Sequence, residues 1–280
     1  MRGVVSAYLI IGKETALVDT GYRSSAANVI QDLLGHRIDD LDYLLPTHVH
    51  LGHTGACGTL AGRFDMAAVL AHPKGTTHLC DPSRLIEATT ELFGVDLMRD
   101  YGAPEPVAQA RVRSVSDGEE IALGSGVTLR AIWTPGHASH HLSYFVEESG
   151  DLLTGDAVGI KLHEFPILLP TTPPTSFNLK LALESLERIR KLAPSRFLTP
   201  HFGVIGNVKE AIDDNIRSLA EWKTDIESMM AKGDSVDDIA EIMVRRMCSL
   251  AGKPPESIPR HLRVSMRLSV LGLVRYMKKL

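Results

Sequence analysis

The sequence predicts an α/β fold: a core of about 205 residues in which strands and helices alternate, followed by a helical C-terminal part. Short apolar runs bounded by Gly, Pro and Asp recur up to residue 199 and have the length of strands. After Gly206, apolar residues recur only at helical spacing. Potential ligand residues also stand directly after several of the expected strands, which is where rigid folds commonly carry their sites.

The first part of the core reads as a hairpin followed by strands and helices in alternation. A turn at Gly12-Lys13-Glu14 separates the first two apolar runs, which suits a hairpin. The expected strands here are, in order, 4–11, 15–20, 41–45 and 66–71, and the expected helices are 24–34 and 83–93.

The second part of the core reads as four strands, one helix and one last strand. The strands are expected at 111–114, 127–133, 141–146, 152–154 and 196–199. The helix shows an apolar stripe at Leu179, Leu183, Leu186 and Ile189. Ser176 is expected to cap its N-terminus and Pro194 to end it.

The C-terminal part reads as helices throughout. Ser235 with Asp238 resembles a capping box, with Asp in place of the usual Glu or Gln, and opens one of these helices. We expect a domain boundary near residue 205, with a core at 1–205 and a helical extension at 206–280 that caps the active site or forms a homodimer.

Composition favours an ordinary globular protein of the cytoplasm. The chain has 280 residues, of which 44% are hydrophobic, and a formal net charge of −4. Its apolar stretches are shorter than the roughly 20 residues that cross a bilayer, so no membrane partner is expected. The three cysteines are scattered and predict no disulfide framework. Residues 242–280 carry nine Lys or Arg against one acid, which we interpret as the solvated face of a helix and not as a nucleic-acid surface.

The segment Thr47-His48-Val49-His50-Leu51-Gly52-His53 carries the strongest chemical signal. It brings three imidazoles directly after the strand at 41–45, and neutral imidazole is the commonest side-chain ligand of zinc and related ions. His48 and His50 are two residues apart and can aim at one point, whereas His53 begins to point elsewhere, as a second ion would require.

Three later strands also end on potential ligands. His137 follows Trp133-Thr134-Pro135-Gly136, Asp156 follows Leu152-Leu153-Thr154-Gly155, and His201 follows Phe197-Leu198-Thr199-Pro200. The same arrangement three times over predicts one site built from strand ends. The roles of His140 and His141 stay open: they either lie near this site or are purely structural.

Together these motifs resemble the metallo-β-lactamase-fold hydrolase superfamily. Asp19-Thr20-Gly21, the histidine cluster, Pro135-Gly136-His137, Gly155-Asp156 and the final His201 appear in the family's order over about residues 4–205. One residue departs from the family pattern: Gly52 stands where His-x-His-x-Asp-His has its aspartate. The resemblance implies an αββα sandwich of two mixed β-sheets flanked by helices.

The resemblance also implies the ligand sets. A first metal would be held by His48, His50 and His137, and a second by His53 and His201, with Asp156 bridging both and Asp19 supporting the ligands from below. Asp156 and His201 would be the catalytic residues. Zinc is the expected metal, bound firmly at the first position and weakly at the second because Gly52 offers no ligand; iron or manganese are possible alternatives.

The implied function is metal-dependent hydrolysis of a small molecule. A metal-bound hydroxide would attack an ester-like bond in a lactone, thioester, phosphoester or related substrate. Two other readings stay open: a degenerate or inactivated metal-binding protein, and an iron-dependent oxidoreductase of the same fold. The lactonase branch of the family often carries a tyrosine after the bridging aspartate, whereas no tyrosine occurs here between Tyr144 and Tyr276, and this counts against a simple lactonase.

Overall fold

The computed structural model describes residues 5–161, 168–201 and 203–279, and these fall into two compact units. Unit 1 comprises residues 1–133, 140–155 and 193–206, and unit 2 comprises residues 134–139, 156–192 and 207–280. The chain crosses between the units several times, so each unit is discontinuous in sequence. The expected boundary near residue 205 stays a prediction.

The first sheet of unit 1 has the strand order β1-β2-β3-β4-β5. Its strands are β1 (Tyr8–Ile11), β2 (Thr15–Val18), β3 (Tyr43–Leu45), β4 (Ala68–Ala71) and β5 (Val112–Ser114). The hairpin β1–β2 is antiparallel, as Gly12-Lys13-Glu14 predicted, and the remaining pairs are parallel. In the parallel register Val18 lies opposite Leu45, which aligns the segments that leave β2 and β3.

The second sheet of unit 1 has the order β13-β12-β9-β8-β7-β6. Its strands are β6 (Glu120–Gly124), β7 (Val127–Trp133), β8 (Leu142–Val146), β9 (Asp151–Leu153), β12 (Arg196–Leu198) and β13 (Val204–Ile205). The β12–β9 pair is parallel and the others are antiparallel, so this sheet is mixed as well.

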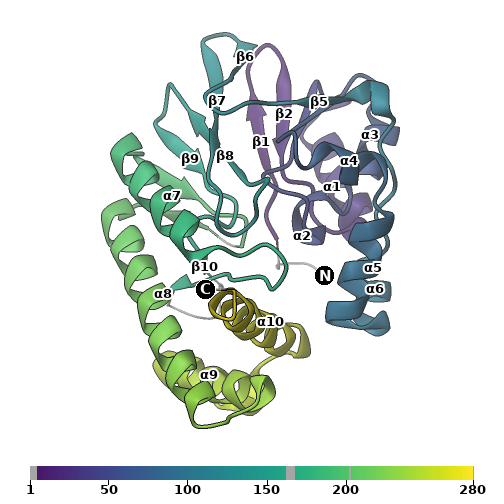
Figure 1. Ribbon diagram of the computed structural model, residues 1–280. Coiled ribbons are helices and arrows are strands. Elements are labelled where there is room, and N and C mark those ends of the chain that lie inside the picture. Colours follow the sequence, from purple (N-terminus) through teal and green to yellow (C-terminus); the bar gives the residue numbers. More distant parts are fainter. Residues whose placement is uncertain (1–4, 162–167, 202, 280) are drawn as a thin grey trace. The chain divides into compact units, whose positions relative to one another are not determined.

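Successive residues of β2 in the first sheet pack in two different buried clusters, one on each face of the sheet. Ala16 and Val18 pack with Leu129 and Tyr144 of the second sheet in one buried cluster. Leu17, between them in the chain, packs on the opposite face in a cluster with residues of α1 and α3. This period of two is what a strand buried on both faces requires. The two sheets of unit 1 therefore stack on each other, and helices cover the outer face of the first (Figure 1).

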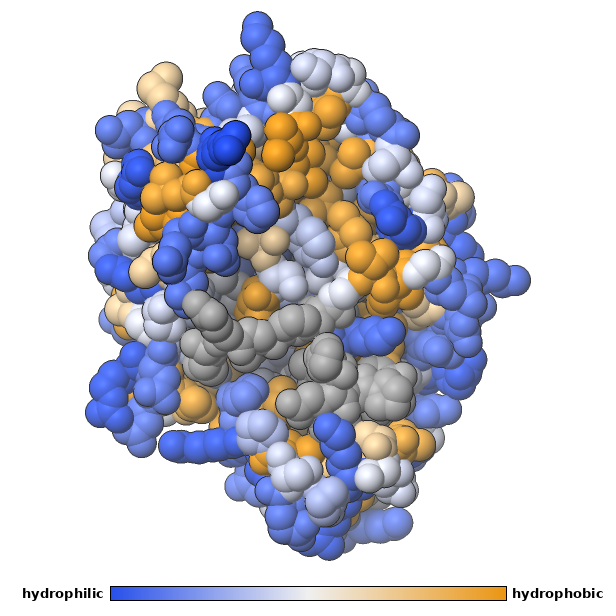
Figure 2. Space-filling model, turned by 180° about the vertical axis from the view of Figure 1, so that it is seen from behind, coloured by the Kyte–Doolittle hydropathy of each residue, from blue (hydrophilic) through white to orange (hydrophobic). Residues whose placement is uncertain are grey.

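The helices of unit 1 are short. They are η1 (Arg23–Ser25), α1 (Ala26–Gly35), α2 (Leu51–Thr54), α3 (Cys57–Arg63), α4 (Thr76–Cys80), α5 (Ser83–Phe93), α6 (Val95–Tyr101) and η2 (Gln109–Arg111). The apolar patches visible in Figure 2 lie among hydrophilic side chains, mainly at the height where Figure 1 shows the sheets.

Unit 2 contains a small ribbon and four longer helices. These are β10 (Ile160–Lys161) paired with β11 (Leu168–Leu169), then α7 (Leu179–Leu192), α8 (Val208–Ala231), α9 (Val236–Ala251), η3 (Pro255–Ser257) and α10 (Arg260–Met277). The capping box of Ser235 and Asp238 at the start of α9 is confirmed. No helix among the described residues is long and apolar enough to cross a membrane.

The expected cap of α7 is wrong. The hydroxyl of Ser176 donates to the carbonyl of His137 at 3.2 Å, and the side-chain oxygen of Asn178 accepts from the amide of Leu181 at 3.1 Å. Asn178 therefore caps the helix, because it stands one residue before the first helical position. The predicted α/β class, two mixed sheets with flanking helices and a helical C-terminal region, is confirmed.

Candidate metal centre

The histidine-rich turn leaves β3 and enters α2 in a way that brings its imidazoles together. His50 is extended (φ −76°, ψ 152°) and precedes the first residue of α2. Extended backbone up to His50 and helical backbone after it bring His53 back toward His48. The ring centroid of His48 lies 4.5 Å from that of His50 and 4.0 Å from that of His53. A ring nitrogen of His48 lies within 4.8 Å of a ring nitrogen of each of the two.

His201 joins this group from the end of β12. Its ring centroid lies 5.6 Å from that of His53, with the two ring planes at 73°. Unit 1 therefore brings together four of the residues that the sequence singled out: His48, His50, His53 and His201.

A buried carboxylate orients the turn. Asp19, which follows β2, lies with Oδ2 at 2.8 Å from Nδ1 of His53. It also accepts from the amide of Thr47 at 2.8 Å and from the Thr47 hydroxyl. Asp19 has a left-handed backbone (φ 58°), which turns its side chain under the histidines. Because the carboxylate accepts from Nδ1, it leaves Nε2 of His53 as the metal-binding nitrogen.

Two further imidazoles, left open by the sequence, lie against the turn. The ring of His141 is fully buried and 5.0 Å from that of His48, and the ring of His140 lies 6.2 Å from that of His50. Burial, reinforced by neighbouring histidines, lowers the pKa of His50 and of His140 to about 3, and lowers that of His141 well below its ordinary value. Imidazoles held neutral in this way have the protonation state that metal ligation requires.

The remaining two candidate ligands lie together in unit 2. Nε2 of His137 is 3.4 Å from Oδ2 of Asp156. Nδ1 of His137 is 3.0 Å from the hydroxyl of Thr171, which itself donates to the backbone carbonyl of Asp156 at 3.1 Å. Since the hydroxyl proton goes to Asp156, Thr171 accepts from Nδ1 of His137. The nitrogen left for a metal is again Nε2, on the side of the carboxylate.

The donor chemistry fits a divalent metal. The six predicted ligands supply five imidazoles and one carboxylate, four in unit 1 and two in unit 2, and within each unit they are neighbours. Sets of nitrogen and carboxylate oxygen suit zinc, iron and manganese alike. Gly52 lies in the same turn, buried and without a side chain.

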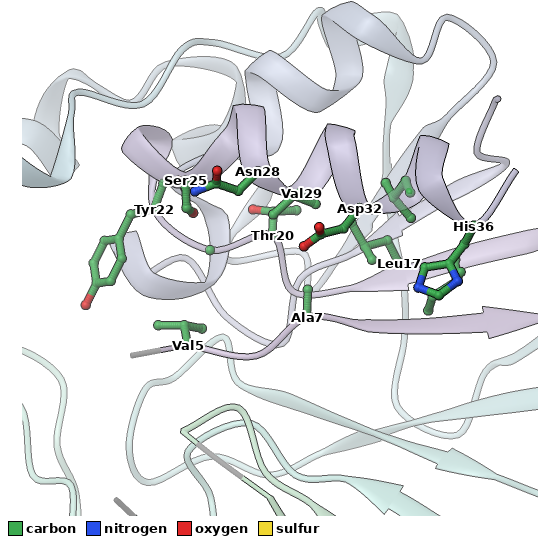
Figure 3. Close-up of a pocket in the computed structure, with 13 residues that line it drawn as sticks. Val5, Ala7, Leu17, Thr20, Tyr22, Ser25, Asn28, Val29, Asp32 and His36 are labelled. Carbon is green, nitrogen blue, oxygen red and sulfur yellow. Dashed lines mark hydrogen bonds between the residues drawn. The ribbon is translucent and has the colours of Figure 1, made fainter. Parts of the chain in front are cut away.

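A cavity of about 480 Å³ lies beside the turn, within unit 1 (Figure 3). Its walls come from β1, from α1 and from the loop between β2 and η1. Apolar side chains such as Val5 and Leu17 line it together with polar side chains of α1, among them Asn28 and Asp32. Tyr22 and Val5 lie at one end of it.

Comparison with known proteins places the chain in one group. A family model described as the metallo-beta-lactamase superfamily matches residues 1–201. The chain is 32% identical over 207 residues to the metallo-beta-lactamase fold-containing protein ST1585 of Sulfurisphaera tokodaii, and the match covers 72% of this chain and 74% of the relative. It is 26% identical over 217 residues to an atrochrysone carboxyl ACP thioesterase of Aspergillus fumigatus, covering 77% of this chain and 56% of that protein.

A solved structure agrees. The crystal structure of the metallo-beta-lactamase family protein TTHA1429 from Thermus thermophilus superimposes with a TM-score of 0.68 at 25% identity, and the match covers 98% of this chain and 88% of that one.

Proposed function

Because the chain belongs to the metallo-beta-lactamase superfamily, we propose that it is a metal-dependent hydrolase that cleaves an ester-like bond in a small molecule. The observation that carries this proposal is the fixed orientation of its ligand imidazoles. Asp19 engages Nδ1 of His53 and Thr171 engages Nδ1 of His137, so both rings present Nε2. Such outer contacts are the mark of ligands built to hold a metal.

In the proposed centre, His48, His50 and His137 would hold a first ion, and His53, His201 and Asp156 would hold a second, with Asp156 also serving the first. The assignment of His137 and Asp156 to this centre is supported by their order along the chain, which matches the order of the family motifs. Zinc is the first metal to test, with iron and manganese as alternatives.

A bound divalent metal would lower the pKa of a water molecule and polarise the oxygen of the substrate's carbonyl or phosphoryl group. The protein's own contribution is to hold the ligands neutral and aligned. Burial keeps His50 uncharged, Asp19 fixes the ring of His53, and the carboxylate of Asp156 supplies negative charge between imidazoles.

A thioester is the substrate class to examine first. One relative is named as an acyl-carrier-protein thioesterase, although the match spans only 56% of its length. The lack of a tyrosine between Tyr144 and Tyr276 disfavours a lactone.

Gly52 favours a second candidate function, that of a metal-binding protein with little hydrolytic activity. With glycine at this position, the second ion of the proposed centre would lack the oxygen ligand that the aspartate of the family motif supplies. In that case the protein would bind metal but cleave none of the ester classes.

The experiment is metal analysis combined with a hydrolysis screen. The purified protein, with its own metal and after reloading with zinc, iron or manganese, is assayed on thioesters, lactones, phosphoesters and sulfate esters. We expect stoichiometric metal and turnover of at least one class, with both lost in His48→Ala. Exposed His36→Asn is the matched control and should keep both. Bound metal with no turnover of any class would favour the second candidate, and a protein that binds no metal would rule out both.

A further inference from the structure

The atoms nearest to position 52, where the carboxylate of the motif is missing, belong to Val5 and Tyr22. A Cβ at this position would lie 3.4 Å from Cγ2 of Val5 and 3.6 Å from both Cζ and Oη of Tyr22. These are ordinary van der Waals distances, so a Cβ here would fit. The polar atom it would meet first is the phenol oxygen of Tyr22.

The segment that carries Tyr22 is fixed against the histidine turn. The amide and hydroxyl of Thr20 both donate to the carbonyl of His53, at 2.8 and 3.0 Å, and the amide of Ala56 donates to the carbonyl of Gly21 at 3.0 Å. Asp19, at the start of the same segment, orients the His53 ring. One short stretch of chain therefore serves both His53 and position 52.

The segment before β1 places position 52 on the side of His201. The amide of Ser6, next to Val5, donates to the carbonyl of Pro200, the residue before His201, at 2.6 Å. Val5 and Tyr22 are the two residues that a Cβ of Gly52 would touch. The space around position 52 thus adjoins the residues of unit 1 that are proposed to hold the second ion.

The ring of Tyr22 is held in one orientation. It stacks on Tyr101, with ring centroids 4.4 Å apart and planes at 10°. In Figure 3 its hydroxyl points away from the cavity beside α1. Burial raises the pKa of Tyr101, and a hydrogen bond with Tyr22 offsets part of that rise. A phenol that shares a proton with Tyr101 can present its remaining oxygen lone pairs to another group.

We propose that the phenol oxygen of Tyr22 replaces the missing carboxylate of position 52 as an oxygen donor to the second ion. This inference rests on the two-ion arrangement of the proposed function. Tyr22 would join His53, His201 and Asp156 as the oxygen ligand that the sequence motif lacks. The histidine motifs do not predict this role in metal binding.

The decisive experiment is a zinc titration of the metal-free full-length protein by calorimetry. Four proteins are compared: the unchanged chain, Tyr22→Phe, Gly52→Asp, and the double variant. We expect two equivalents of zinc in the unchanged chain and a loss of about 10- to 100-fold in affinity for the second in Tyr22→Phe, as for other groups that support a metal. In the Gly52→Asp background, Tyr22→Phe should reduce the affinity for the second zinc only slightly, because the introduced carboxylate would then supply the oxygen ligand.

A spectroscopic readout separates ligation from mere support of the fold. Loaded with ferric iron, the unchanged chain should show the visible charge-transfer absorption of an iron-bound phenolate, and Tyr22→Phe should lack it. Tyr43→Phe is the matched control, because Tyr43 lies in β3 before the turn and should keep the absorption and the second zinc equivalent. Circular dichroism and the Tm check that each variant is folded.

Three results would overturn the inference: a single zinc equivalent in the unchanged chain, an unchanged second equivalent in Tyr22→Phe, or equal losses in both backgrounds of position 52. Binding of the first zinc equivalent distinguishes a failure of the role of Tyr22 from a failure of the proposed function. If it binds and hydrolysis is found while Tyr22→Phe changes nothing, only the role of Tyr22 fails. If no variant binds zinc, iron or manganese, the proposed function fails as well.

Discussion

The two ligand-bearing turns, one in each unit, are fixed by different forces. The turn of His48, His50 and His53 in unit 1 is held by the charge of buried Asp19. The turn of His137 in unit 2 is held by close packing and neutral hydrogen bonds.

The packing in unit 2 is tight at Gly136. A Cβ on Gly136 would lie 2.4 Å from Cα of Ala182 in α7. The amide of Asn178 donates to the carbonyl of Gly136 at 2.9 Å, and the hydroxyl of Ser185 donates to that of Pro135 at 2.6 Å. The orienting partner of His137 is Thr171, which carries no charge.

In this fold, the orientation of a metal ligand and its affinity for the metal are therefore set by separate means. A neutral partner fixes the ring and the tautomer, whereas a carboxylate partner also makes the imidazole a stronger ligand. The turn in unit 1 depends on charge and should respond to pH and charge-removing substitutions. The turn in unit 2 depends on shape and should respond to added volume.

Acid should produce the largest effect, and it acts through unit 1. The pKa of His50 and of His140 is about 3 in the folded protein and near 6.5 when unfolded. Between these values the unfolded chain binds more protons, so the free energy of unfolding falls as pH falls below 6.5, by up to about 1.4 kcal/mol per pH unit for each histidine. Urea unfolding of the metal-free protein from neutral pH to about pH 4 measures this slope. A His50→Asn variant with an undiminished slope would contradict it.

Added volume in the turn of unit 2 should come next. Gly136→Ala places a methyl group against the backbone of α7 at a glycine with φ 135°, and we expect a loss of about 3 kcal/mol in the free energy of unfolding. Gly126→Ala is the control, because Gly126 also has a positive φ (80°), whereas a methyl group there would meet no described atom within 4 Å. Equal losses in the two variants would mean that packing does not hold this turn.

Removal of the charge of Asp19 in unit 1 should lower the free energy of unfolding somewhat less than Gly136→Ala does. It should also weaken metal binding. Asp19→Asn keeps the shape of the side chain and weakens the bonds to Thr47 and His53, so we expect a loss of about 2 kcal/mol and a 10- to 100-fold loss in metal affinity. Asp151→Asn is the control, since Asp151 is a buried carboxylate paired with Arg196 in the same unit. It should lower stability and leave metal affinity unchanged, as measured by urea unfolding and zinc titration.

Removal of the neutral partner in unit 2 should have the smallest effect. Thr171→Val removes the hydroxyl that contacts His137, and we expect a loss of about 1 kcal/mol and a smaller drop in metal affinity than for Asp19→Asn. The neighbouring Thr172→Val removes a bond to the carbonyl of Ser269 and should leave metal affinity unchanged. If Thr171→Val lost as much metal affinity as Asp19→Asn, the contrast between charged and neutral support would be wrong.

The sequence allowed the strands and their terminal ligands to be predicted because both are local patterns. The strand 127–133 and the capping box at Ser235 were predicted residue by residue and are confirmed. The cap of α7 was predicted at Ser176 and lies at Asn178, because two polar residues near one helix start compete and the tertiary contact of Ser176 with His137 decides.

Contacts between distant segments could not be predicted in this way. The approach of Tyr22 to Gly52 depends on the pairing of residues 19–22 with the turn after β3, and on Tyr101 from α6, a helix that was not predicted. The place of His141 depends on β8 beginning at Leu142, one residue later than predicted.

The left-handed backbone of Asp19 limits what evolution or a designer can place there. Position 19 must satisfy a backbone demand, which glycine and asparagine meet most easily, and a chemical demand, which only a short carboxylate meets in full. Glycine would adopt the left-handed backbone but supply no carboxylate. Glutamate would supply a carboxylate at best but would not meet the backbone demand. In a saturation library, asparagine should be the most tolerated replacement for folding, and none should equal aspartate for metal binding.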